Sequence, residues 1–324
     1  MSKAWDVLAL GRACVDEILE AETYPDEDCK CALLARLREG GGQASTAACL
    51  VAHLGGRAAF LGILGGDEEG RFARARMEAF GVDVSLSPAP WGVTPLAYCI
   101  VSRSGETRTI LYQRSEAAPL RWSEVGESVL AGCRAVLVDP QAEHLLPDLV
   151  PACRRLGVTL VADAEHARDG WAQTWGRVDV LAVSETFLSE LAPGLPPDSA
   201  LARAAEGAQG LAVATLGPRG AIAFLEGRAV GFPAPRIEVR DSTGAGDAFH
   251  GALCLALARA FRLPDAIRYA VAAASLSCRG LGGRSFPTAA EVDALWPQLP
   301  IVAWDPSRTR IHHHIPGRRQ AGRP

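Results

Sequence analysis

Directly before a long apolar segment, the chain reads DSTGAGDAF from Asp241 to Phe249. Small residues ahead of a helix N-terminus let backbone N–H groups approach an anion closely, and the helix dipole strengthens the attraction. A carboxylate beside such an anion can take a proton from a hydroxyl that attacks phosphorus. Asp247 is therefore a candidate general base, although a cap beneath a glycine turn is the alternative role for this residue.

Outward from this segment, the chain alternates between apolar strands and helices. From about residue 130, the runs AVLVDP, VTLVADA, VDVLAVS, LAVATLG and AIAFLEG are apolar, with polar or helical segments between several of them. Continuous apolar strands that alternate with helices predict a largely parallel sheet covered on both faces. Residues 5–11 have the pattern of a further buried strand.

Two other segments, residues 12–38 and 95–115, have the alternating apolar and polar pattern of half-exposed strands. The second segment carries a turn at Ser104-Gly105. We expect the two segments to form one small sheet that is apolar on one face and therefore covers something.

The composition limits the class of protein. With 324 residues and 48% hydrophobic residues, the chain can bury a core, and its length fits one large α/β domain with a small appendage. The net charge of −4 argues against a nucleic-acid partner. We find no secretory signal and no membrane span, and we expect a cytoplasmic protein whose nine cysteines are reduced and buried or half-buried. Residues 1–304 form the predicted domain, and residues 305–324 are predicted to be a disordered tail.

The segment 241–249 resembles the C-terminal signature of the ribokinase-like family of carbohydrate kinases, also called the PfkB family. Residues 41–48, GGQASTAA, resemble the glycine motif with which this family binds its sugar, and LGILGGDEEG resembles the usual continuation. Residues 214–220, ATLGPRG, resemble the strand and turn beside the nucleotide. The resemblance extends over roughly residues 5–300.

This resemblance implies a three-layer α/β/α fold with a largely parallel central sheet and a small β-sheet lid over the sugar. It implies ATP and Mg²⁺, and many members also use a monovalent cation such as K⁺ near the signature loop. Carried over to this chain, the implied catalytic residues are Asp247, Gly244, Ala245 and Gly246. The implied sugar-binding residues are Asp16, Gly42, Gln43 and Thr46, and the residues that border the nucleotide are Thr215, Gly217 and Gly220.

The chain departs from the family pattern at two places. Many members have Asn where this chain has Thr46, so the pattern of sugar hydroxyls that is recognised should differ from that of ribose. Many members also carry an N-x-x-E motif near the phosphates, but here Ser184 replaces the Asn and Phe187 stands at the position of the Glu. The metal ligands therefore stay open, with Glu185 and Asp241 as candidates.

Two subfamilies share these departures. The lid and sugar-binding regions resemble those of ketohexokinase, whereas GAGDAFHGAL and CRGLGGRSFP resemble bacterial sulfofructose kinase. We favour phosphorylation of a ketohexose or related sugar. A nucleoside kinase, a sulfofructose kinase and a non-catalytic sugar or nucleotide sensor are the alternatives, and a dehydrogenase is disfavoured because no G-x-G-x-x-G follows the first strand.

Two further expectations concern His250 and the lid. His250 follows the signature on the first turn of the helix, where a packed ring is favoured over a contact with Asp247 or a phosphate. The lid has a strand edge and an apolar face, and pairing between two subunits would cover such an edge. The sequence therefore predicts a homodimer through the lid.

Overall fold

The computed structural model describes residues 3–88, 92–105, 107–113 and 119–305. The predicted disordered tail, apart from its first residue, lies outside the described residues. No helix within the described ranges is both long and apolar enough to cross a membrane.

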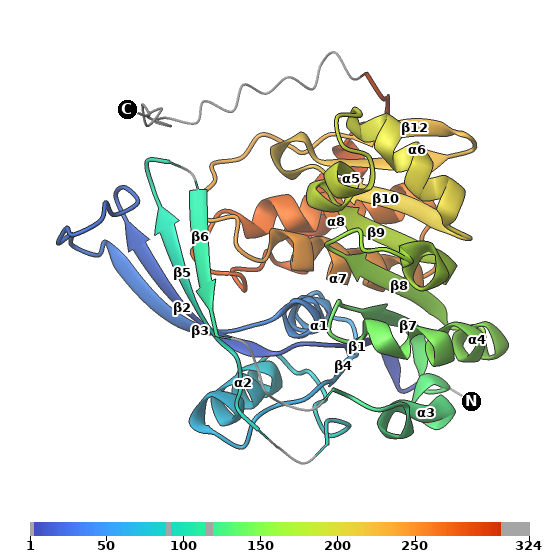
Figure 1. The fold of residues 1–324 in the computed structure, drawn as a ribbon, viewed down its shortest axis with the longest axis horizontal. Helices are drawn as coiled ribbons and strands as arrows, with labels where there is room; N and C mark the ends of the chain where they lie inside the picture. Colours follow the sequence, from blue (N-terminus) through green and yellow to red (C-terminus); the bar gives the residue numbers. More distant parts are fainter. Residues whose placement is uncertain (1–2, 89–91, 106, 114–118, 306–324) are drawn as a thin grey trace, which may run out of the picture.

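A nine-stranded sheet forms the centre of the molecule (Figure 1). Its order is β13-β12-β11-β10-β9-β8-β7-β1-β4, and the six strands from β10 to β4 are parallel, whereas β11, β12 and β13 are antiparallel. This order confirms the prediction of a largely parallel sheet. The bounds are β1 (Trp5–Leu10), β4 (Ala58–Leu61), β7 (Cys133–Val138), β8 (Thr159–Ala164), β9 (Val180–Ser184), β10 (Leu211–Thr215), β11 (Ala221–Leu225), β12 (Arg228–Phe232) and β13 (Val302–Ala303).

Helices cover both faces of this sheet and produce two hydrophobic cores. Along β1, Val7 and Ala9 point into one core while Leu8 and Leu10 point into the other, because successive side chains of a strand face opposite sides. The first core is closed by α1 (Gln43–His53), α2 (Glu68–Ala79), α7 (Ala245–Ala258), α8 (Leu263–Ser277) and α9 (Ala289–Leu295). The second is closed by α3 (Trp122–Leu130), α4 (Leu146–Leu156), α5 (Glu185–Leu191) and α6 (Pro197–Gly207). The predicted three-layer α/β/α arrangement is thereby confirmed.

A second sheet of four strands, which we call the lid, stands at one side of the α/β body (Figure 1). Its order is β3-β2-β5-β6, from β2 (Cys14–Ala21), β3 (Ala35–Gly41), β5 (Leu96–Ser102) and β6 (Thr107–Tyr112). β2 pairs with β5 in parallel and joins the two segments, as the sequence predicted. On one face, Ile18, Ala97, Cys99 and Val101 form a small cluster against which Leu37 and Leu281 pack.

The expectation for the cysteines was partly wrong. All nine are unpaired, and seven are buried, but Cys29 and Cys31 are exposed. They lie in the connection between β2 and β3, which forms no strand and is exposed around both residues.

Candidate active site

The carboxyl ends of the parallel strands β1, β7 and β8 meet at one edge of the central sheet. In open α/β sheets, ligands bind at this edge because loops and helix N-termini converge there. Two acidic residues stand at this edge, Asp139 directly after β7 and Asp163 near the end of β8. The N-terminal ends of α1 and α7 carry the glycine motif and the signature loop.

The first turn of α7 presents unoccupied backbone donors. Gly244 occupies the N-cap position with a positive φ of 72° and no side-chain cap. In the described part of the chain, the amides of Gly244, Gly246 and Asp247 donate to no acceptor, whereas Ala245 N donates to Ser242 O at 3.3 Å. The N-terminus of a 14-residue helix with free amides is suited to bind an anion.

Asp241 holds this loop in place through three hydrogen bonds. Its Oδ1 accepts hydrogen bonds from Thr243 N at 2.8 Å and Thr243 Oγ1 at 2.7 Å, and its Oδ2 accepts one from Gly282 N at 2.8 Å. Its side chain is buried, with 2% exposure. A side chain at Gly244 would meet the backbone oxygen of Gly283 at 2.6 Å, so the loop is also packed closely on its neighbour.

The half-buried carboxyl of Asp247 lies in an acidic environment. Burial first, and then the negative charge of Asp163, raise the pKa of Asp247 to about 8, with smaller contributions from Asp16 and Asp139, while His250 acts in the opposite direction. The carboxyl group is therefore ready to exchange a proton near neutral pH, as a general base requires.

His250 and Asp163 connect the two helix N-termini. His250 Nδ1 lies 3.2 Å from Asp163 Oδ2, and Gln43 Nε2 donates to the same Asp163 oxygen at 3.4 Å. Burial disfavours the charged ring, but the adjacent carboxylate outweighs it and raises the pKa of His250. His250 is buried as the sequence favoured, yet it also pairs with an acid in the cluster around Asp247.

The predicted sugar-binding residues surround the N-terminus of α1. Asp16 projects from β2 of the lid, and its carboxylate would clash with any side chain at Gly41, at 2.1 Å. Gln43 opens the helix and contacts Asp163, whereas Thr46 is buried within its first turn. Burial raises the pKa of Asp16, and the like charges of Glu39 and Asp241 act in the same direction.

Two buried residues that the sequence did not single out hold the glycine motif in place. Asp139 accepts hydrogen bonds from the amides of Arg12, Ala44 and Gln141, at 2.7, 3.3 and 2.8 Å. Arg284, which is 7% exposed, donates to Ser45 Oγ at 2.8 Å. Asp139 and Asp163 share a sequence signal, an acidic residue at the end of an apolar strand. Arg284 lies in the quoted segment CRGLGGRSFP, but that resemblance gave the residue no role.

The predicted nucleotide-binding residues lie further along the same edge of the sheet. Thr215 ends β10, and Gly217 and Gly220 bound the short turn that follows, both with positive φ. They are placed beside α5, which begins after Ser184. Within the described ranges, no hydrogen bond joins these three residues to the acidic cluster.

The altered N-x-x-E segment has a structural role in this chain. Ser184 Oγ caps α5 by accepting from Phe187 N at 3.0 Å, and Phe187 packs edge-to-face on Trp171 in the core. Glu185 is ion-paired with Arg219. Among the described residues, no group of three or more acidic, histidine or cysteine side chains is placed to hold a metal ion.

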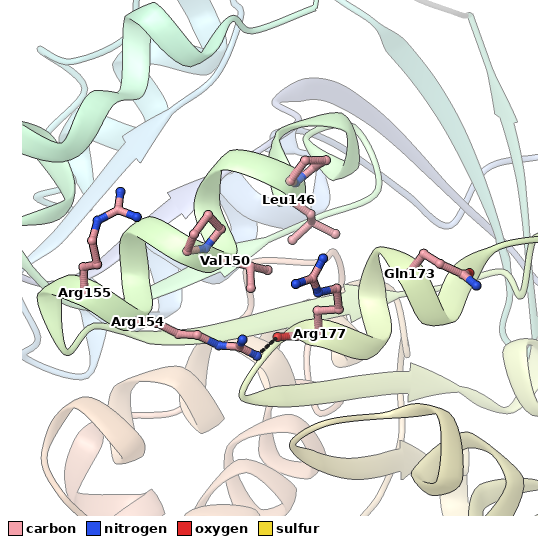
Figure 2. Close-up of a pocket in the computed structure, with 8 residues that line it drawn as sticks. Leu146, Val150, Arg154, Arg155, Gln173 and Arg177 are labelled. Carbon is pink, nitrogen blue, oxygen red and sulfur yellow. Dashed lines mark hydrogen bonds between the residues drawn. The ribbon is translucent and has the colours of Figure 1, made fainter.

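A cavity of about 430 Å³ lies at a different place, between α4 and the segment that carries Gln173 and Arg177 (Figure 2). Arg154, Arg155 and Arg177 line it together with apolar residues of α4, and Arg154 donates to the backbone oxygen of Arg177 at 3.1 Å. None of the predicted site residues lines this cavity, so the catalytic assignments rest on the sheet edge and not on this hollow.

Comparison with known proteins gives a consistent result. The family model described as pfkB family carbohydrate kinase matches residues 6–289. Mouse ketohexokinase is 26% identical over 307 residues, which cover 86% of this chain and 97% of that protein. The ATP-dependent ribose-1-phosphate kinase of Halopiger xanaduensis is also 26% identical, over 89% of this chain and 97% of that protein. The structure assigned as Ribokinase II from E. coli, in complex with ATP and Mg²⁺, has a TM-score of 0.75 at 20% identity and covers 92% of this chain and 100% of that one.

Proposed function

Because the chain belongs to the pfkB family of carbohydrate kinases, we propose that it transfers the γ-phosphoryl group of ATP to a hydroxyl of a ketohexose or related sugar. The observation that carries the proposal is the position of Asp247. Its carboxyl lies on the first turn of α7, beside free amides and among the acidic side chains that surround the glycine motif.

The chemistry assigns each group one task. Asp247 accepts the proton of the attacking hydroxyl, the hydroxyl oxygen bonds to the γ-phosphorus, and the bond from that phosphorus to the bridging oxygen breaks to release ADP. The proposed anion hole of Gly244, Ala245 and Gly246 stabilises the charge on the transferred group. The amides of Gly244 and Gly246 are free to donate, whereas that of Ala245 would first have to leave Ser242 O. Asp16 and Gln43 orient the sugar, and the lid excludes water.

Mg²⁺ bound with ATP neutralises charge on the phosphate oxygens. The two candidate ligands are already engaged in this structure, Glu185 with Arg219 and Asp241 with Thr243 and Gly282, so we assign no protein ligand to Mg²⁺. We also propose that K⁺ or a similar cation acts near the signature loop, where the buried carboxylate of Asp241 lies. Equal kcat in potassium and tetramethylammonium buffers would contradict the cation proposal.

The substrate proposal is tested with a panel of acceptors at fixed ATP and Mg²⁺. Fructose and other ketohexoses, ribose, ribose-1-phosphate, sulfofructose and nucleosides are each supplied, and ADP formation is followed by a coupled assay. We expect the highest kcat/KM with a ketohexose. A preference for nucleosides or sulfofructose would overturn the substrate class but not the kinase assignment, whereas ligand binding without any ADP formation would indicate a sensor.

The raised pKa of Asp247 predicts how the rate depends on pH. The base must be deprotonated, so kcat/KM should rise with pH and level off above about pH 8. Because the charge of His250 lowers the pKa of Asp247, His250→Asn should move this limb to higher pH. A pH profile of kcat/KM for both proteins checks the shift, and a limb that moves to lower pH would contradict the assignment.

The exposed residues of the lid support a homodimer. Tyr98, Ile110, Leu111 and Tyr112 are large apolar side chains that solvent reaches on β5 and on the edge strand β6. Two lids that pair at this edge would cover them. We expect light scattering to give twice the monomer mass at micromolar concentration, and Leu111→Lys to shift the protein to monomer. A wild-type monomer across that range would refute the interface.

We further propose a cytoplasmic location, which the nine unpaired cysteines and the need for ATP support. Cell fractionation with an antibody to the chain tests it, and recovery from a secreted or periplasmic fraction would contradict it.

A further inference from the structure

A carboxylate of the lid is bound by arginines from two separate parts of the chain. Glu20, on β2, is 0% exposed. Arg103, in the turn after β5, approaches it at 3.2 Å, and Arg240 approaches the same oxygen at 2.9 Å. A buried carboxylate requires such partners, because an unpaired charge in the interior is strongly destabilising.

The two arginines belong to different parts of the structure. Arg103 is part of the lid itself. Arg240 immediately precedes Asp241, whose hydrogen bonds hold the signature loop in place. The backbone amides of Arg240 and Asp241 both donate to Cys278 O at the end of α8, at 2.9 and 3.2 Å. Of the two ion pairs of Glu20, the pair with Arg103 therefore stays within the lid, and the pair with Arg240 joins the lid to the segment that carries the candidate anion hole.

A second contact joins the lid to this segment at Ser242, two residues after Arg240. Arg108 of the edge strand β6 donates to Ser242 Oγ at 2.8 Å. Ser242 O in turn accepts the hydrogen bond from Ala245 N. The lid thus contacts the loop on both sides of Asp241.

Apolar packing completes this junction. Leu281 packs against the apolar cluster of the lid, and a side chain at Gly282 would meet Ile18 and Leu37 at 2.9 Å. Gly282 also donates to Asp241. Residues 281 and 282 therefore contact the lid on one side and Asp241 on the other.

We propose that the lid is fastened to the signature loop through Glu20–Arg240 and Arg108–Ser242, and that Arg240 is a positioning residue for phosphoryl transfer. The inference rests on the proposed kinase function. Glu20 of the lid fixes the side chain of Arg240. The position of Arg240 in turn keeps the backbone of Arg240 and Asp241 hydrogen-bonded to Cys278 O. Asp241 then holds the loop so that its amides lie where the transferred group must bind. Because the lid also carries Asp16, a sugar seated under it would favour the same arrangement.

The structure offers a matched pair of variants. Arg103→Gln and Arg240→Gln each remove one cation from Glu20, and the two arginine side chains are similarly accessible, at 50% and 44% exposure. Both variants should lower the thermal unfolding temperature to a similar extent, since each leaves the other arginine to neutralise Glu20. A purely structural salt bridge predicts equal effects on the rate as well.

The expected result is unequal. Arg240→Gln should lower kcat about tenfold or more, because small displacements of positioning groups have large effects on rate, whereas Arg103→Gln should leave kcat within about twofold. KM for ATP should change little in either variant. In a Glu20→Gln background, Arg240→Gln should add less than it does alone, because the two residues act through one contact. Equal kcat values in Arg240→Gln and Arg103→Gln would overturn the proposal.

A measurement without catalysis separates this inference from the kinase assignment. Amide hydrogen exchange of residues 241–249 should accelerate in Arg240→Gln and remain unchanged in Arg103→Gln, with no substrate present. If the wild-type protein phosphorylates no acceptor, the proposed function fails while the exchange result still tests the fastening. Should Arg240→Gln not fold, Arg240→Lys is used, and exchange at the wild-type rate together with wild-type kcat would count against the proposal.

Discussion

Asp247→Asn is expected to lower kcat by about 10³-fold or more while the protein remains folded, in the upper range of what a general base contributes. Asparagine has nearly the same shape as aspartate but cannot accept the proton of the attacking hydroxyl. The free amides of Gly244 and Gly246 remain in place, so binding of ATP should persist. Steady-state kinetics with the preferred sugar and calorimetric titration of ATP measure the two effects separately.

The same variant should be more stable than the wild type near neutral pH. The pKa of Asp247 is about 8 in the folded chain against 3.8 for an ordinary aspartate, so folding requires a proton that the unfolded chain does not bind at neutral pH. This penalty is absent below about pH 4, grows as pH rises towards 8 and then levels off. Asparagine carries no such penalty. The difference in unfolding temperature between the variant and the wild type should therefore increase from pH 4 to pH 8.

Two outcomes would contradict the assignment of Asp247. Activity within tenfold of the wild type would show that another group accepts the proton or that none is needed. Loss of activity together with a lower unfolding temperature at pH 8 would instead indicate that the charge of Asp247 stabilises the end of the helix, which is a structural role.

The sequence predicted those parts of the site that are local in the chain. Gly244, Gly246 and Asp247 lie within four residues, and their spacing before an apolar helix is enough to place free amides and a carboxyl together. The parallel strands were likewise predictable, because strands buried on both faces are apolar throughout.

Contacts between distant segments could not be predicted in the same way. Alternation along 12–38 suggested half-exposed strands, yet Glu20 is completely buried, because β2 lies between β3 and β5 and faces the body through Arg240. The pair joins residues that are 220 positions apart, and nothing in either segment alone indicates the other. Arg284 with Ser45 is a similar case, at a separation of 239.

The second large effect is expected from Gly244→Ala. Gly244 has a φ of 72°, which residues with a Cβ rarely adopt, and the added atom would lie 2.6 Å from the oxygen of Gly283 and 2.7 Å from its Cα. Both neighbours are backbone atoms, so the clash can be relieved only by moving the loop itself. Displacing the amides should lower kcat about 10²-fold or more, the range seen when one donor of an oxyanion hole is removed.

A matched control distinguishes steric displacement from backbone strain alone. Gly81, which follows α2, has a φ of 85°, and a side chain there would meet nothing within 4 Å. Gly81→Ala should therefore lower the unfolding temperature through the unfavourable φ but leave kcat unchanged, whereas Gly244→Ala should lower both. If Gly244→Ala retained the wild-type kcat, the amides of this loop could not be the groups that stabilise the transferred phosphoryl, because the loop cannot keep its position around the added atom.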